Sequence, residues 1–109
     1  MMNILHILAI SRTSSFHCRG GFEDHMNTLY SGLAALGHRV SFVTTAHPEE
    51  PNLRYKVRQG VSYYFLSQTF PGIYSPAFNK RSCDFMNRFI IKEKVDVLHS
   101  QSMGAAWFL

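Results

Sequence analysis

Apolar residues along this chain form short continuous runs that alternate with longer segments of helical period. The continuous runs lie at 3–11, 39–45 and 95–100 and are rich in Ile, Leu and Val. Runs of this kind are typical of strands that are buried on both faces of a parallel sheet. We therefore expect three core strands over these ranges.

A helix is predicted between the first two strands. Its apolar residues recur at spacings that place them on one face: Phe22, Met26, Leu29, Leu33 and Leu36. Glu23 and Asp24 lie in its first turn, where the helix dipole favours acidic side chains. Gly37 is placed to end this helix, because glycine adopts the left-handed conformation without strain.

A second helix and a small hairpin are predicted between the second and third core strands. Phe78, Ser82, Phe85 and Phe89 share one helical face, which predicts a helix over 77–94. Before it, 54–58 and 61–66 are expected to be short strands around Gln59-Gly60. Cations alternate with apolar residues along the first of these strands and predict one cationic and one apolar face: Arg54, Lys56 and Arg58 against Tyr55 and Val57. We interpret the cationic face as solvated, with contact to acidic lipid head groups as the functional alternative.

This order of elements predicts an α/β fold with a Rossmann-like parallel sheet and flanking helices. The chain has 109 residues, enough for one small domain. Residues 104–109 are expected to begin a further helix. The apolar run from Ile4 to Ile10 is too short to span a membrane and lacks the features of a signal peptide.

Charge and cysteine content narrow the partners and the compartment. Eleven Lys and Arg face seven Asp and Glu, a balance that suits an anionic partner but is too weak to indicate nucleic acid. Cys18 and Cys83 belong to no CxxC pair, which favours two reduced thiols in a cytoplasmic protein. His17, Cys18 and His25 do not have the spacing of a structural zinc site, and no metal is expected.

Two polar features fall at the carboxyl ends of predicted strands, where open parallel sheets bind ligands. Gly20-Gly21 precedes the first helix and either contacts a phosphate or forms a tight loop whose glycines only satisfy backbone geometry. At the end of the third core strand, His99 and Gln101 either bind a polyhydroxylated ligand or are structural. The chain has neither a GxGxxG nor a GxxxxGK[ST] motif, which argues against dinucleotide and P-loop sites.

Two segments of the chain resemble a known family. GGFEDHMNTLYSGLAALGHRVSFVTT matches the opening of the large retaining GT-B glycosyltransferases that include the phosphatidylinositol mannosyltransferases. KVDVLHSQS resembles that family's Asp-Val-Val-His-x-His segment, with Gln101 in place of the second His. The two motifs occur in the family's order and at its separation, and the resemblance covers nearly the whole chain.

The resemblance implies that residues 1–109 are an incomplete N-terminal, acceptor-side domain of a GT-B fold, without the C-terminal donor domain. Such an enzyme transfers a sugar from a UDP- or GDP-sugar to a sugar or a lipid-linked acceptor with retention and needs no cofactor. Gly20 and Gly21 are then donor-phosphate contacts. His25, His99 and Gln101 are acceptor-side residues, and no catalytic residue is expected in this chain. A cytoplasmic location is expected, with possible peripheral contact at the anionic inner membrane face.

Two alternatives remain open. As a glycosyltransferase fragment, the chain alone is expected to be inactive in sugar transfer. The first alternative is a non-catalytic Rossmann-like module that self-associates. An open sheet edge and the apolar residues Trp107, Phe108 and Leu109 favour a homodimer. A small nucleotide-binding domain of another enzyme class is the third interpretation.

Overall fold

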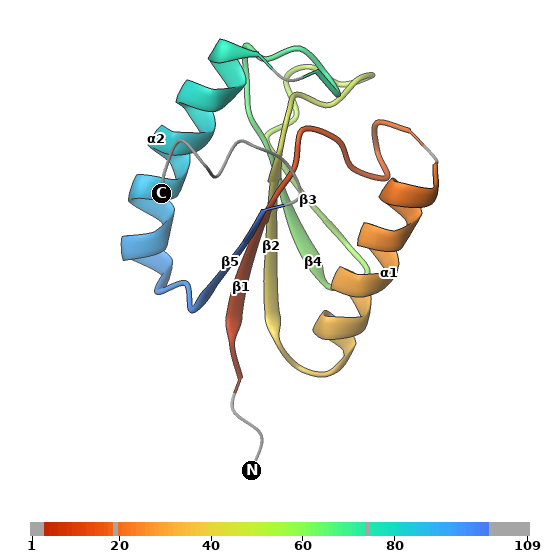
Figure 1. Ribbon diagram of the computed structural model, residues 1–109, viewed down its shortest axis with the longest axis vertical. Coiled ribbons are helices and arrows are strands. Elements are labelled where there is room, and N and C mark those ends of the chain that lie inside the picture. The colour runs from red at the N-terminus through yellow and green to blue at the C-terminus, as the bar shows by residue number, and fades with distance from the viewer. Residues whose placement is uncertain (1–3, 19, 74, 101–109) are drawn as a thin grey trace.

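The computed structural model describes residues 4–18, 20–73 and 75–100 (Figure 1). Its elements follow the chain in this order: β1 (His6–Ile10), α1 (Gly21–Ala35), β2 (Arg39–Thr44), β3 (Tyr55–Arg58), β4 (Val61–Phe65), α2 (Pro76–Glu93) and β5 (Val97–Ser100).

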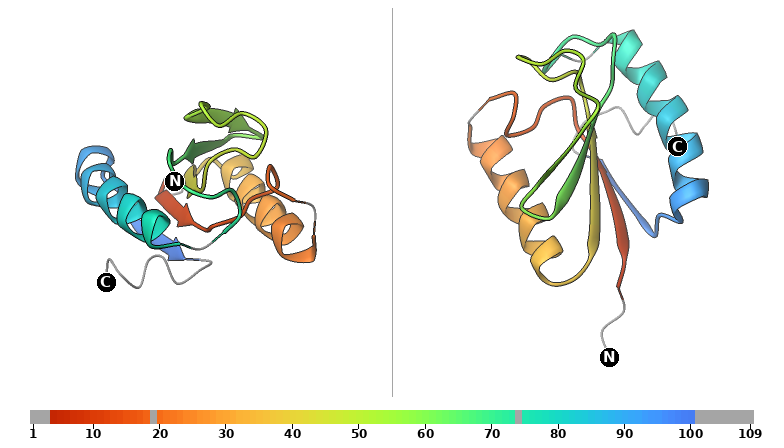
Figure 2. Two further views of the ribbon diagram at one scale, coloured as in Figure 1. Left: turned by 90° about the horizontal axis from the view of Figure 1, so that it is seen from above. Right: turned by 180° about the vertical axis from the view of Figure 1, so that it is seen from behind.

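The strands form one five-stranded sheet in the order β3-β4-β2-β1-β5. All neighbouring pairs are parallel except β3 and β4, which are antiparallel. Seen from above, α1 and α2 lie on opposite faces of the sheet (Figure 2). The predicted α/β fold with a mostly parallel, Rossmann-like sheet is confirmed.

Strand β1 lies inside the sheet, between β2 and β5, and all five of its residues are buried. Its one polar side chain, His6, has partners for both ring nitrogens. Nδ1 lies 3.0 Å from the carbonyl oxygen of Glu93, and Nε2 lies 3.0 Å from Oγ of Ser41. A carbonyl only accepts, so Nδ1 carries the hydrogen and Nε2 accepts from the Ser41 hydroxyl.

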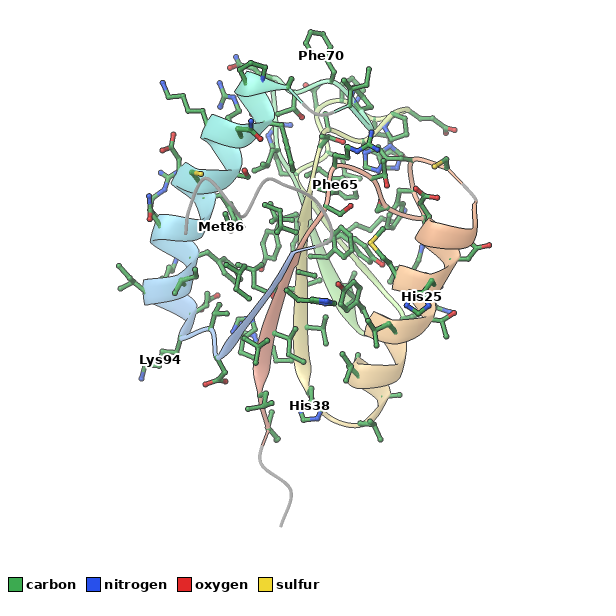
Figure 3. The ribbon with its side chains drawn as sticks, viewed as in Figure 1. His25, His38, Phe65, Phe70, Met86 and Lys94 are labelled. Carbon is green, nitrogen blue, oxygen red and sulfur yellow. The ribbon has the colours of Figure 1, made fainter. Side chains whose placement is uncertain are left out.

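Each helix buries its apolar face against one face of the sheet. Helix α1 covers a cluster that is rich in aromatic residues: Ala9, Met26, Tyr30, Val40, Phe42, Val61, Tyr63 and Phe65. Helix α2 covers the other cluster: Leu8, Ile10, Val43, Leu66, Phe78, Met86 and Phe89. Met86 of α2 and Phe65 of β4 are labelled in Figure 3.

Some of the predicted burial is wrong in detail. Leu36 was expected on the buried stripe of α1, but it is 60 % exposed because it lies beyond the helix end, where the chain turns toward β2. Tyr30, which the predicted stripe does not include, is fully buried. On β3, the expected apolar face of Tyr55 and Val57 is 48 % and 53 % exposed, because neither helix extends over this edge strand.

The end of α1 and the start of α2 both follow from local chemistry. Gly37 has a positive φ of 98°, and its N–H donates to the carbonyl oxygen of Ala34 while that of His38 donates to Leu33. This pair of bonds is the Schellman arrangement, which confirms Gly37 as the residue that ends α1. At the start of α2, Oγ of Ser75 accepts from the N–H of Phe78, and Pro76 occupies the first helical position.

Gly37, which follows α1, and Gly32, which lies within it, give a matched test of how α1 ends. Gly37→Ala should lower the free energy of unfolding by about 1 kcal/mol or more, because an L-residue is strained at positive φ. Gly32→Ala should raise it by about 0.5–1 kcal/mol, because Gly32 is within α1 and a Cβ there meets nothing within 4 Å. Urea unfolding of both variants measures the difference, and equal effects of the two would contradict the assignment.

Candidate functional site

The polar loops of the sheet gather at its carboxyl edge. The strands β1, β2 and β4 run in the same direction, so the described residues that follow them, in 11–18, 45–54 and 66–73, emerge together. In Figure 1 they lie along the upper edge, where both helices also begin. Ligands of open α/β sheets bind at this edge, which makes it the candidate functional site.

The side chain of Thr45 joins three of these loops. Its Oγ1 donates to the carbonyl oxygen of Arg12 at 2.7 Å and accepts from the N–H of Gly72 at 2.8 Å. The Arg12 guanidinium adds a bond to the carbonyl oxygen of Gly72. A second threonine also joins two loops: Oγ1 of Thr69 accepts from the N–H of Ala46 and donates to the carbonyl oxygen of Leu66. The loops are thus fixed to one another by side-chain bonds.

His17 completes this network in its neutral form. Its Nε2 lies 3.0 Å from the carbonyl oxygen of Ala46 and 2.9 Å from Oγ1 of Thr45, so Nε2 carries the hydrogen. Nδ1 then accepts from the N–H of Ser14 at 3.1 Å. Burial lowers the pKa of His17 below its ordinary value of 6.5, and His47 adds to this, against the opposing effects of backbone hydrogen bonds and Glu23. Nδ1 also lies 2.9 Å from Oγ of Ser14, and its protonation would place a hydrogen against the Ser14 N–H.

Phe16 anchors the same loop onto the sheet. Its ring packs edge-on against Tyr63 and Phe65, with centroids at 4.9 and 5.4 Å. The guanidinium of Arg58 lies 3.5 Å above the ring, and its Nη1 donates to Oγ of Ser15. Lys56 lies over the same ring at 5.7 Å. The interpretation of the cationic face as solvated holds for Arg54 and Lys56, which are exposed. It is wrong for Arg58, which is half-buried in a cation–π contact with a loop that the sequence pattern does not connect to β3.

Gly20 and Gly21 lie at the start of α1, as predicted, with Gly20 in extended conformation as the N-cap. Oε2 of Glu23 accepts from the Thr13 hydroxyl at 2.8 Å, so this carboxylate folds back over the helix start. A Cβ on Gly20 would lie 2.8 Å from Oε1 of Glu23, whereas a Cβ on Gly21 would meet nothing within 4 Å. The open approach to the helix N-terminus is therefore at Gly21.

The structure describes two of the three predicted acceptor-side residues, His25 and His99. His99 is the third residue of β5 and is half-buried, with Nδ1 2.8 Å from the phenol oxygen of Tyr30 on α1. His25 is exposed on the second turn of the same helix (Figure 3). Gln101 lies outside the described residues, as do Trp107, Phe108 and Leu109. No described contact joins His99 or His25 to Gly20 or Gly21.

Comparison with known proteins adds to this geometry. The family model of Glycosyltransferase Family 4 matches residues 19–109, from the glycine loop to the last residue. The chain belongs to glycosyltransferase family 4. It is also 28 % identical over 99 residues to the phosphatidylinositol N-acetylglucosaminyltransferase gpi3 subunit of Schizosaccharomyces pombe. That match covers 83 % of this chain and 19 % of the relative, so the chain spans about a fifth of the length of the relative.

Three further features of the described part of this family 4 chain bear on function: metal ligands, cysteines and apolar helices. Among those residues, no three His, Cys, Asp or Glu side chains are grouped to hold a metal ion, and both nitrogens of His17 bond to protein atoms. Cys18 and Cys83 are free thiols. No helix within the described ranges is long and apolar enough to cross a membrane.

The sequence analysis missed the residues that organise this family 4 site. Thr45, Thr69 and Phe16 received no role, and His17 was considered only as a metal ligand. Thr45 is 27 residues from Gly72 and 33 from Arg12, so no local spacing reveals these bonds. The available signal was the density of Ser, Thr and His directly after two strands at the ligand-binding edge.

The neutral state of His17 predicts how stability depends on pH. The folded chain binds this proton less readily than the unfolded chain, so stability should fall as pH drops through about 6.5 and level off below the folded pKa. His17→Gln should lower the free energy of unfolding by about 1–2 kcal/mol at pH 7.5, since the Ser14 N–H loses its acceptor. It should also flatten the curve between pH 7.5 and 5, whereas Gly32→Ala, which removes no titratable group, should not. Identical slopes for wild type and His17→Gln would contradict a neutral, buried His17.

Proposed function

We propose that this chain forms part of the acceptor-side domain of an enzyme that transfers a sugar from a nucleotide-sugar to an acceptor with retention of anomeric configuration. One observation carries the proposal: the N-terminus of α1 opens at Gly21 on the carboxyl edge of the sheet. The family match begins beside this loop. The donor in this proposal is a UDP- or GDP-sugar, and no cofactor is required.

Gly21 is the proposed contact for the donor diphosphate. The first N–H groups of a helix have no partner within the helix, and the helix dipole favours an anion beside them. Glu23 already supplies one negative charge on the Gly20 side, where its carboxylate is held by Thr13. A phosphate oxygen therefore approaches best from the Gly21 side, where no side chain stands in the way. Gly20 contributes by leaving room for the Glu23 carboxylate.

The proposed acceptor side is built on β5 and α1. Nδ1 of His99 lies 2.8 Å from the Tyr30 hydroxyl, which fixes the orientation of the imidazole. Tyr30 is fully buried, so this contact is shielded from competing water. In the proposed function, the imidazole of His99 and the exposed His25 line the acceptor side together with Gln101.

The acceptor class is proposed from the relative. The relative is a subunit of a phosphatidylinositol N-acetylglucosaminyltransferase. By analogy we propose a sugar or lipid-linked polyol as acceptor, handled on the cytoplasmic side of a membrane. The excess of basic residues, 11 Lys and Arg against seven Asp and Glu, supports contact with an anionic surface.

The phosphate contact can be tested on the chain itself with inorganic pyrophosphate. In NMR titrations of the ¹⁵N-labelled chain, the backbone amide signals of residues 21–23 should shift, with a dissociation constant of about 1 mM or weaker for such an open site. Gly21→Ala should weaken this binding without lowering thermal stability, because its methyl group fills space that is otherwise open. Gly32→Ala, later in the same helix, is the matched control. Equal binding by Gly21→Ala and wild type would rule out the contact.

Sugar transfer should require more than these residues. The related enzyme subunit is about five times longer than the matched stretch, since the match covers 19 % of it. We therefore expect no release of UDP or GDP from nucleotide-sugars above the spontaneous rate when the purified 109-residue chain is supplied with polyol or phosphoinositide acceptors. Turnover by the purified chain, lost on Gly21→Ala, would overturn this expectation while keeping the donor contact.

A further inference from the structure

A groove runs along the side of α2 that faces β4. It consists of two adjoining hollows of about 280 and 360 Å³. Both hollows are lined by Tyr64, Phe85 and Arg88, so they form one continuous depression. The groove exists because β3 continues the sheet beyond the part that α2 covers, and it does not involve Gly20 or Gly21.

The floor of the groove is aromatic. Tyr64 lies 5.3 Å from Phe85 and 5.2 Å from Phe89 between ring centroids, and the two phenylalanines stack at 5.1 Å. Tyr55 of β3 extends this surface, with its ring 5.1 Å from that of Tyr64. Aromatic side chains combined with convergent polar groups are a common composition of a small-molecule site.

The rim of the first hollow is cationic. Arg54, Arg81 and Arg88 surround it, and Asp84 is its one acidic residue. Three cations against one carboxylate leave a net charge of +2, which matches the charge of about −1.5 to −2 on a phosphomonoester at pH 7. Each arginine engages one oxygen acceptor of the protein, from Pro51, Gln68 or the Asp84 backbone, and a guanidinium has further N–H donors for a ligand.

Helical spacing gives the groove its polarity. Arg81, Phe85, Arg88 and Lys92 are separated by four, three and four residues, so they form one stripe on α2 that is about 16 Å long. The second hollow has Lys92 at its far end, and its carboxylate, Glu93, bonds to Arg39 at 3.1 Å. Arg54 and Arg81 therefore line only the first hollow, whereas the rings of Tyr64 and Phe85 continue into the second.

We propose that this groove binds a phosphorylated sugar or polyol. Its phosphate lies in the first hollow, where the forked guanidinium groups of Arg81 and Arg88 match phosphate oxygens. Its ring lies in the second hollow, with the apolar face of the ring against Tyr64 and Phe85. The ligand is either a soluble sugar phosphate or the head group of a phosphoinositide, since the two share this chemistry.

Glucose 6-phosphate is the probe for the test, with glucose and inorganic phosphate as its two halves. Titration of the ¹⁵N-labelled 109-residue chain should shift the amide signals of residues 63–66 and 81–92, and glucose 6-phosphate should bind more tightly than either half. The double variant R81Q/R88Q should weaken binding about tenfold or more, through the loss of two charge-assisted contacts. Phe85→Leu should weaken binding of glucose 6-phosphate but not of inorganic phosphate.

Lys80→Gln is the matched control, because Lys80 is an exposed cation of the same helix that lines a different hollow. Its binding should stay within about twofold of wild type. Circular dichroism and thermal unfolding verify that each variant folds. Titration with soluble myo-inositol phosphate and, separately, with vesicles that contain phosphatidylinositol 4-phosphate distinguishes a soluble sugar phosphate from a phosphoinositide head group as the ligand.

Three outcomes would overturn the proposal. The first is the absence of saturable binding by any phosphorylated probe up to about 10 mM. The second is equal weakening by R81Q/R88Q and Lys80→Gln, which would indicate a non-specific charge effect. The third is binding to vesicles that contain any anionic lipid, phosphatidylserine included, without binding of sugar phosphates, which would make the surface a general membrane contact.

Discussion

The rest of the structure depends on the burial of β1 on both faces and its pairing on both sides. All five of its residues are buried, and its backbone is shared between β2 and β5. A strand in this position must be covered from above and below, so α1 and α2 take opposite faces. Because β1 and β2 are parallel, their carboxyl ends lie at the same edge of the sheet, which brings the loop after β1 against Thr45. The polar network of the site is thus a consequence of how this strand is buried.

Most of the fold could be predicted because its signals are local. Strand runs and helical spacings are visible within windows of a few residues, and Gly37 marks the end of α1 by its own conformation. Burial was less predictable, as Leu36 and Tyr30 show. Leu36 continues the apolar spacing but lies past the last helical residue, whereas Tyr30 carries a hydroxyl that pattern reasoning treats as polar and that here bonds to His99.

The candidate site was predictable in position and not in organisation. Gly20 and Gly21 lie where the sequence places them, but their surroundings depend on Thr13 and Glu23, which contact each other across the loop. Their hydrogen bond moves a carboxylate toward Gly20 and makes the two glycines unequal. His17 shows the same limit, because its neutral tautomer is determined by Ser14 on one side and by Thr45 and Ala46 on the other. Such roles belong to the folded chain and leave no spacing in the sequence.

The antiparallel strand β3 explains why the two faces of the molecule differ. Its odd-numbered residues, Tyr55 and Val57, face the side of α2, and its even-numbered residues, Lys56 and Arg58, face the side of α1. On the α1 side, Phe16 reaches across and covers the strand with cation–π contacts. On the α2 side Tyr55 and Val57 are about half exposed, and the half-buried Tyr64 beside them lines the groove. A single edge strand therefore packs against the Phe16 loop on one face and leaves on the other the groove whose arginines we assign to a phosphorylated ligand.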